Sequence, residues 1–228
     1  MRRSLFFRGL RERPGFSLFK SCGLIIIMKK GVLMRNRVRA LRITILSALS
    51  FILMLIEFPI PLFPLFLKMD FSDLPALIAA LSMGPLSGAA VELIKNILHG
   101  ILAGHTAFIG ETANFLVGLS FILTASLVHR RLRSEKKAVY AGLAGTLAMS
   151  ASAAVLNFVL FLPLYETVLG IPVEAVIRMA SSVNRLVTDK WSLILWSMVP
   201  FNLLKGMILT VILSLLYRKL EGMIKRAG

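Results

Sequence analysis

Charged and amide side chains interrupt an otherwise apolar segment between residues 66 and 118. An ionisable group in lipid costs roughly 2.5–3.5 kcal/mol on insertion scales, so several together indicate a functional site or a paired network. These side chains are Asp70, Asp73, Glu92, Lys95, Asn96, Glu111 and Asn114. They could also serve only to join helices, since Glu92 and Lys95 are one helical turn apart and can pair. Both interpretations stay open at this point.

A second polar group lies near the C-terminus, where Asn202 and Lys205 are three residues apart and share one helix face. A buried ammonium has three donors to satisfy, so Lys205 needs Asp70, Glu92, a carbonyl or a ligand as its partner. Other apolar segments offer the amides Asn96, Asn114 and Asn157. Several amides beside one ammonium suit an uncharged ligand with many hydrogen-bonding atoms, whereas a buried lysine–carboxylate pair is the alternative.

Catalytic and metal chemistry find little support in the sequence. It has no His-Glu-x-x-His, no Gly-x-Ser-x-Gly and no phosphate-binding Gly-x-x-x-x-Gly-Lys-Ser/Thr loop. His99 and His105 have no acidic residue at a ligand spacing, and Cys22 is the only cysteine, so we expect neither a metal site nor a disulfide. We therefore predict no catalytic residues and no cofactor.

The elements that position these residues must be membrane helices. Of the 228 residues, 57% are hydrophobic and 17% are charged, and the mean hydropathy is +0.81. Long continuous apolar runs of this kind are typical of a polytopic membrane protein. We predict an all-α fold, a single bundle of six transmembrane helices, with spans near residues 42–57, 71–83, 86–102, 109–128, 138–162 and 191–216.

The net charge of +16 does not indicate nucleic-acid binding, because the positive residues are clustered. Of 27 lysines and arginines, 12 lie in residues 1–42, five in residues 129–137 and four in residues 218–228. Such clusters beside membrane spans mark the cytoplasmic side. Six spans with both termini in the cytoplasm place all three clusters there.

Residues 1–34 are predicted to be a basic N-terminal extension, and residues 35–228 the membrane domain. The extension contains one apolar run that is too short to span a bilayer. We expect it to be disordered or bound to the membrane surface, or to reflect a translation start that truly lies at Met28 or Met34.

Two further segments carry recognisable patterns. Three prolines within residues 58–70 predict an irregular loop on the outer side of the membrane, which covers another part of the protein. On the first span, Ala40, Thr44 and Ala48 recur every four residues, which lets another helix approach closely. That face could receive a partner protein or pack within the bundle.

Pro163 is expected to end the fifth span. A short amphipathic helix over residues 173–186 is expected in the loop before the last span.

Five sequence stretches, in this order, resemble the substrate-binding S components of energy-coupling factor (ECF) vitamin transporters, most closely the riboflavin-specific ones. The resemblance covers about residues 40–218. The stretches are Phe66-Leu67-Lys68-Met69-Asp70-Phe71-Ser72-Asp73-Leu74-Pro75, Gly84-Pro85-Leu86-Ser87-Gly88, Lys95-Asn96-Ile97-Leu98-His99, Gly110-Glu111-Thr112-Ala113-Asn114-Phe115 and Pro200-Phe201-Asn202-Leu203-Leu204-Lys205-Gly206.

The resemblance implies a six-helix protein of the bacterial plasma membrane that binds riboflavin near its outer face. Such proteins hydrolyse no ATP themselves and dock on a membrane scaffold subunit that carries two ATPases. The docking surface would be Ala40, Thr44 and Ala48, although Thr44 departs from the usual alanine. The substrate-binding residues would be Asn202, Lys205 and Asn157, with Asp70, Lys68 and Asn114 as further candidates. An S component for another vitamin, a proton-driven carrier and a membrane-embedded enzyme remain the alternatives.

Overall fold

The protein is largely helical. The computed structural model of the protein describes residues 14–134 and 136–227. In chain order the elements are α1 (Pro14–Leu55), β1 (Phe58–Pro59), β2 (Lys68–Met69), α2 (Asp73–Met83), α3 (Pro85–Leu102), α4 (Ile109–Arg131), α5 (Lys137–Leu156), η1 (Asn157–Phe161), α6 (Leu162–Leu169), α7 (Val173–Ser181), α8 (Lys190–Leu193), η2 (Ile194–Met198) and α9 (Val199–Ala227).

The chain divides into two units, residues 1–42 and residues 43–228. The first unit contains most of α1, which begins at Pro14 and not near the predicted residue 42. Proline is favoured in the first turn of a helix, and no further proline interrupts the chain before Leu55. Residues 1–13 of the predicted extension lie outside the described residues, and the limits of the extension stay a prediction.

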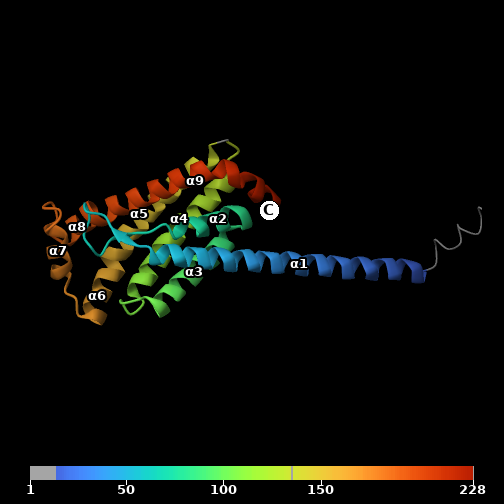
Figure 1. Cartoon of the computed structure of the whole chain (residues 1–228), viewed down its shortest axis with the longest axis horizontal. Helices are drawn as coiled ribbons and strands as arrows, with labels where there is room; N and C mark the ends of the chain where they lie inside the picture. The colour runs from blue at the N-terminus through green and yellow to red at the C-terminus, as the bar shows by residue number, and fades with distance from the viewer. Residues whose placement is uncertain (1–13, 135, 228) are drawn as a thin grey trace, which may run out of the picture. The chain divides into compact units, whose positions relative to one another are not determined.

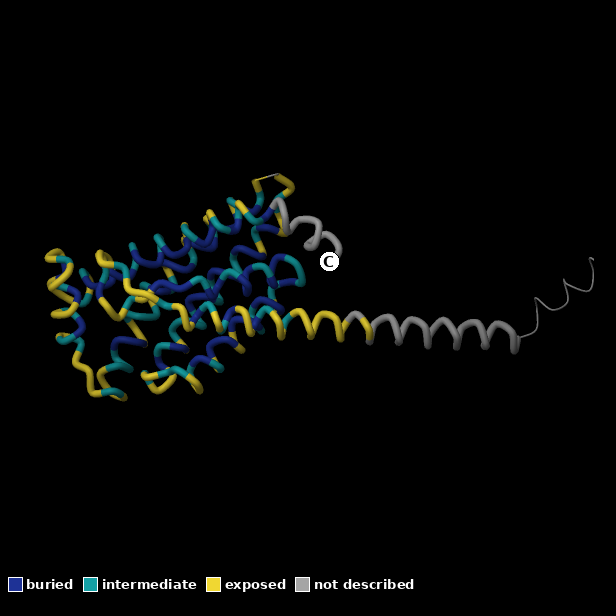
Figure 2. Tube along the Cα trace, in the orientation of Figure 1, coloured by how far each residue is buried: buried dark blue, intermediate teal, exposed yellow. Residues whose placement is uncertain are grey.

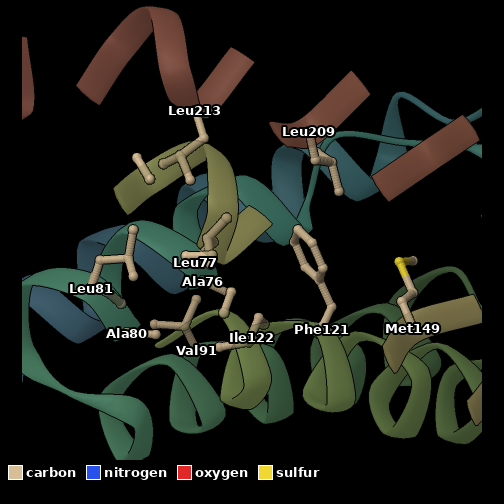
Figure 3. Packing of buried hydrophobic residues seen from close by; sticks show 14 of the residues in the cluster. Ala76, Leu77, Ala80, Leu81, Val91, Phe121, Ile122, Met149, Leu209 and Leu213 are labelled. Carbon is tan, nitrogen blue, oxygen red and sulfur yellow. The ribbon is translucent and has the colours of Figure 1, made fainter. Parts of the chain in front are cut away.

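The second unit is built around α5, which packs against α4 on one side and α9 on the other (Figure 1). The shorter α2 contacts α3, α4 and α9. Small side chains let these helices approach closely, and larger ones such as Phe121 and Leu209 fill the space between them (Figure 3). The alanines of this core are Ala76, Ala79, Ala80, Ala125, Ala138, Ala141 and Ala153.

The surface of this unit is apolar, as a membrane protein requires. Many large hydrophobic residues are exposed, among them Leu127, Leu147, Val155 and Leu215. Buried and exposed positions alternate along the helices of this unit (Figure 2). Four helical stretches among the described residues are long and apolar enough to cross a membrane: Asn36–Leu55, Ile109–Arg131, Lys137–Leu169 and Lys190–Tyr217. The chain is therefore an all-α membrane protein.

The break between the spans predicted at residues 71–83 and 86–102 is confirmed as a turn. Gly84 ends α2 with φ +106°, a backbone conformation that favours glycine, and Pro85 opens α3. α2 has 11 residues, which is short for a bilayer, and α3 carries Glu92, Lys95 and Asn96 within its 18 residues.

The prediction that Pro163 ends the fifth span is wrong. The helix continues through η1 and α6 to Leu169. In η1 the helix widens to π geometry, and the N–H of Leu162 donates to the carbonyl of Asn157, five residues back. This wider turn shifts the hydrogen-bond pattern just before the proline, which has no N–H to donate.

Two loop predictions need smaller corrections. The amphipathic helix begins at Val173 as predicted but ends at Ser181 and not at residue 186. Within the proline-rich loop, β1 and β2 form an antiparallel pair in which Phe58 lies opposite Met69. Each strand has only two residues, because the prolines between them cannot donate to a longer ladder.

The close contact between α2 and α3 gives a test of the packing. A Cβ atom at Gly88 would lie 2.5 Å from the Cβ of Ala80 and 2.7 Å from the carbonyl oxygen of Ala76. We expect Gly88→Ala to destabilise the protein by about 1–3 kcal/mol, because the helices must separate. Thermal unfolding in detergent measures this. Leu86→Ala, at a 78% exposed position of α3, is the control and should change stability by less than about 0.5 kcal/mol. An unchanged unfolding midpoint for Gly88→Ala would contradict this packing.

Candidate functional site

The polar site begins at the residues that join β2 to α2. Asp70 follows β2 directly, and its Oδ1 accepts hydrogen bonds from the backbone N–H of Ser72, at 2.8 Å, and from the Ser72 hydroxyl. Ser50 of α1 donates from its hydroxyl to the carbonyl oxygen of Ser72. These local bonds fix the turn, so that Asp70 and Asp73 are both buried and lie close together.

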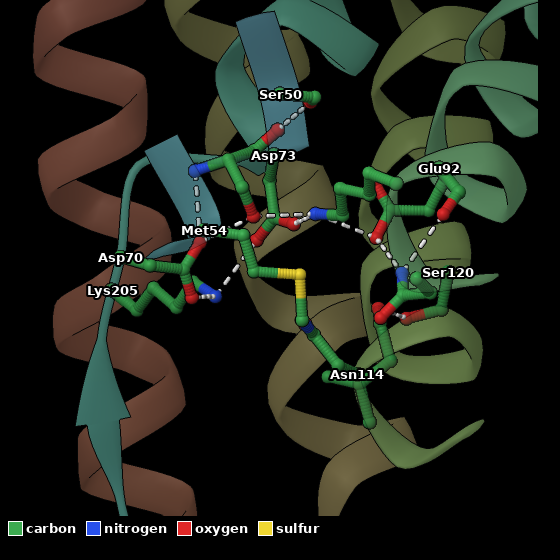
Figure 4. A network of polar contacts seen from close by, with 12 residues as sticks. Ser50, Met54, Asp70, Asp73, Glu92, Asn114, Ser120 and Lys205 are labelled. Carbon is green, nitrogen blue, oxygen red and sulfur yellow. Dashed lines mark hydrogen bonds and ion pairs between the residues drawn. The ribbon is translucent and has the colours of Figure 1, made fainter. Parts of the chain in front are cut away.

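Lys205 of α9 pairs with both aspartates (Figure 4). Its Nζ lies 2.9 Å from Asp70 Oδ2, with hydrogen-bond geometry, and 3.0 Å from Asp73 Oδ2, where the contact is an ion pair alone. The lysine is only 4% exposed. A carboxylate was one of the predicted partners of Lys205, and the structure places Asp70 in that role and adds Asp73.

Lys95 of α3 occupies the other side of Asp73. Its Nζ pairs with Asp73 Oδ1, lies 2.8 Å from Glu92 Oε1 and donates to Ser72 Oγ at 2.7 Å. Lys95, Asp73 and Glu92 have no exposed surface. The pairing of Glu92 with Lys95, which the sequence offered as one of two interpretations, is present, and Asp73 is shared by the two lysines.

The network contains more carboxylates than ammonium groups. Three carboxylates, Asp70, Asp73 and Glu92, meet two ammonium groups. Charges removed from water are tolerated only when they are paired and hydrogen-bonded. The network therefore holds the loop before α2, the start of α2, α3 and α9 in a fixed arrangement.

The predicted amides Asn157 and Asn202 lie beside the two π-helical turns. Asn157 is the first residue of η1, and its Nδ2 donates to the carbonyl oxygen of Ala153 at 2.8 Å. Asn202 Nδ2 donates at 2.8 Å to the carbonyl oxygen of Met198, the last residue of η2. Neither Oδ1 accepts a hydrogen bond from another described residue. Each amide therefore keeps an acceptor for another molecule.

Both amides border one apolar cluster. Met198 belongs to it, and Phe158, which follows Asn157, packs against it. The cluster consists of Leu162, Val176, Ala180, Val187, Leu193, Ile194 and Met198. An apolar wall with a few polar atoms at its edge is the usual lining of a small-molecule site. A π-helical turn is frequent at such sites. The sequence reasoning missed these turns, although Pro163 and Pro200, two residues after η1 and η2, are a signal for them.

The other two predicted binding residues, Asn114 and Lys68, have partners outside the ion-pair network. Asn114 of α4 is half-buried, and its Nδ2 lies 3.8 Å from the sulfur of Met54 (Figure 4). The Lys68 ammonium pairs with Glu57, and these side chains are 47% and 30% exposed. Their proposed contact with a ligand stays a prediction.

A separate polar cluster joins the end of α3 to the start of α4. His99 Nδ1 lies 3.0 Å from Glu111 Oε1, and Thr106 donates to Glu111 Oε2 at 3.1 Å. Within the described residues no group of three His, Cys, Asp or Glu side chains could hold a metal ion.

The predicted docking residues Thr44 and Ala48 are exposed on α1, while Ser47 and Ser50 on the opposite face are buried. Ala40 belongs to the first unit of the chain, residues 1–42. A docking role for these residues stays a prediction.

Comparison with known proteins matches residues 39–217 to the family described as "ECF transporter, substrate-specific component". The riboflavin transporter FmnP of Bacillus subtilis is 41% identical over 186 residues, which cover 81% of this chain and 92% of FmnP. The riboflavin transporter RibU of Staphylococcus aureus is 35% identical over 193 residues, which cover 85% and 95% of the two chains.

A solved structure is also similar. It is described as "Structure and mechanism of the S component of a bacterial ECF transporter". Its chain is 33% identical, the TM-score is 0.66, and the match covers 83% of this chain and 99% of the other.

The shared carboxylates give a test of the network. Lys205→Met leaves Asp70 and Asp73 with one ammonium group fewer, and we expect a loss of about 3–5 kcal/mol in stability. Lys205→Met/Asp70→Asn restores the original charge difference and should recover part of that loss. Thermal unfolding in detergent compares the two variants.

Lys136→Met, in an exposed loop, is the control for loss of a lysine and should change stability by less than about 0.5 kcal/mol. If Lys205→Met were as stable as the unchanged protein, the ion pairs with Asp70 and Asp73 would contribute nothing to the fold.

Proposed function

The chain belongs to the family of ECF transporter substrate-specific components, and we propose on this basis that it binds riboflavin and mediates its uptake as the S component of an ATP-driven ECF transporter. The observation that carries the proposal is the likeness to riboflavin transporters of two bacterial genera along nearly their whole length. Its role is thus that of a transporter subunit.

The binding residues in this proposal are Asn157, Asn202 and Lys205. Flavin has a ring edge on which carbonyl oxygens and nitrogens alternate, and its opposite edge is apolar. The free Oδ1 atom of either asparagine suits the one ring N–H, and the ammonium suits a carbonyl oxygen. The apolar cluster that contains Met198 suits the dimethylbenzene edge.

Lys205 can bind the ligand without leaving its carboxylates. An ammonium group has three donors; one is donated to Asp70, and the contact with Asp73 is an ion pair without a hydrogen bond. A donor therefore remains for a carbonyl oxygen of the flavin. Asp70 would then act beside Lys205, whereas Lys68 and Asn114 are peripheral candidates.

In the membrane we propose six spans, with α2 and α3 as the two short ones. Both pack against longer helices: α2 against α4 and α9, and α3 against α4. Their charged side chains are buried in the network and do not face lipid. The basic clusters near both chain ends and in residues 129–137 support cytoplasmic termini in a bacterial plasma membrane.

Energy for uptake would come from partners. We propose a membrane scaffold subunit with two ATPase subunits, because the sequence has no phosphate-binding loop of the Gly-x-x-x-x-Gly-Lys-Ser/Thr type. The exposed Thr44 and Ala48 would form the centre of the docking surface, where small side chains let a partner helix approach.

Riboflavin binding is tested on the protein purified in detergent. We expect riboflavin to co-purify, or to bind when added, with flavin absorption bands in the stoichiometry of one ligand per chain. Quenching of riboflavin fluorescence gives the affinity. A colourless protein that does not quench riboflavin fluorescence would contradict the proposal, and thiamine and pantothenate would then be tested.

The same assay tests the binding residues. Asn202→Ala removes one acceptor for the ligand and should weaken riboflavin binding about tenfold, which is about 1.4 kcal/mol. Thr210→Val is the matched control, because Thr210 lies two turns further along α9 and is also buried. Its affinity should equal that of the unchanged protein. If the unchanged protein, Asn202→Ala and Thr210→Val all bound riboflavin with the same affinity, the flavin would bind away from Asn202.

Dependence on a partner is tested with Ala48→Glu. A carboxylate on the docking surface should block close approach of the scaffold, so we expect loss of labelled riboflavin uptake in cells with unchanged binding by the purified protein. Ala151→Glu, at an exposed alanine of α5, is the control and should retain uptake. Normal uptake by Ala48→Glu would exclude docking at this position.

A further inference from the structure

We infer that Asp73 and Lys95 are positioning residues for riboflavin: Asp73 holds Lys205 at the ligand, and Lys95 holds Asp73. The inference rests on the proposed function, since it concerns the same binding site. The predicted binding residues did not include Asp73 or Lys95. Both act through Lys205 and need not touch the flavin.

The first step is the position of the Lys205 ammonium. A lysine has a long flexible stem, and one anionic partner would leave its ammonium free to rotate. Here Nζ has two partners, Asp70 Oδ2 at 2.9 Å and Asp73 Oδ2 at 3.0 Å. The two carboxylates come from different places, the residue after β2 and the first turn of α2. These two contacts fix the position of the ammonium group from which Lys205 can donate to a ligand.

The second step is the position of Asp73. Its other oxygen, Oδ1, pairs with Lys95, which is itself held by Glu92 Oε1 at 2.8 Å and by Ser72 Oγ at 2.7 Å. Helix α4 closes this side of the network. A Cβ atom at Gly118 would lie 2.6 Å from Glu92 Oε1 and 3.3 Å from Asp73 Oδ1, so the absence of a side chain at this position lets α4 pack directly against the network.

The consequence is a preorganised ammonium group. If Asp73 lost its charge, Lys205 would be held by Asp70 alone, and riboflavin binding would have to order the lysine side chain. Asp73→Asn keeps the shape of the residue and leaves two carboxylates for two ammonium groups. Every buried charge then still has a partner, so this variant is expected to fold.

The test measures riboflavin affinity and the absorption spectrum of the bound flavin. We expect Asp73→Asn to weaken binding about tenfold, which is about 1.4 kcal/mol, and to shift the flavin bands because the hydrogen bond from Lys205 changes. In Lys205→Met/Asp70→Asn, where that hydrogen bond is absent, adding Asp73→Asn should cause no further loss. Thr210→Val again is the control with unchanged affinity and spectrum.

A second variant covers the case in which Asp73→Asn does not fold. Lys95→Met/Glu92→Gln removes one charge of each sign, so the charge difference of the network stays the same. It should also weaken binding and shift the spectrum, again only when Lys205 is present. A folded Asp73→Asn or Lys95→Met/Glu92→Gln protein with the original affinity and spectrum would overturn the inference.

Three other results would also decide against it. If Asp73→Asn weakened riboflavin binding equally in the unchanged protein and in Lys205→Met/Asp70→Asn, Asp73 would not act through Lys205. Normal affinity of Lys205→Met/Asp70→Asn would show that Lys205 does not bind the ligand. Failure of the unchanged protein to bind riboflavin would overturn the proposed function and this inference with it, so the two failures are distinguishable.

Discussion

The structure depends on one buried carboxylate that two lysines share. Asp73 lies between Lys95 of α3 and Lys205 of α9 and has no exposed surface. Neither lysine could be buried beside lipid-facing helices without an anion, because an unpaired charge in such a medium is costly. Charge thus fixes α2, α3 and α9 of a helical bundle whose core is otherwise mainly apolar. The same place adjoins the residues proposed to bind riboflavin.

The two helices that carry the proposed binding amides are both irregular. Each contains a π-helical turn followed two residues later by a proline, η1 before Pro163 and η2 before Pro200. Pro200 has no N–H to donate to the carbonyl oxygen of Trp196, four residues back. That oxygen accepts a hydrogen bond from Asn184 Nδ2 at 3.2 Å instead. Irregular backbone is tolerated within a membrane only where protein or a cavity surrounds it. Its position beside Asn157 and Asn202 fits a binding site.

Much of this was predictable from residue types alone. Apolar runs located the helices, the gap between two runs located the turn between α2 and α3, and the spacing of Glu92 and Lys95 made their pairing one of two open interpretations. The prediction that Pro163 ends the fifth span was wrong. A proline usually ends a helix, but the π-helical turn before Pro163 accommodates it. The beginning of α1 was also misplaced, since basic residues do not prevent a helix that no proline interrupts.

The sequence by itself determined the class of the protein, the approximate helices and, through five ordered stretches, the family. The class and the helices follow from composition and local periodicity, which act over a few residues, and the family follows from the resemblance of those stretches to known members. Only the tertiary structure decided which charges meet. Asp73 and Lys205 are 132 positions apart, and Lys205 could have paired with Glu92, a carbonyl oxygen or a ligand alone. The choice was made when α2, α3 and α9 packed together, because that packing excludes water and leaves each buried charge only the partners that the helices bring within reach.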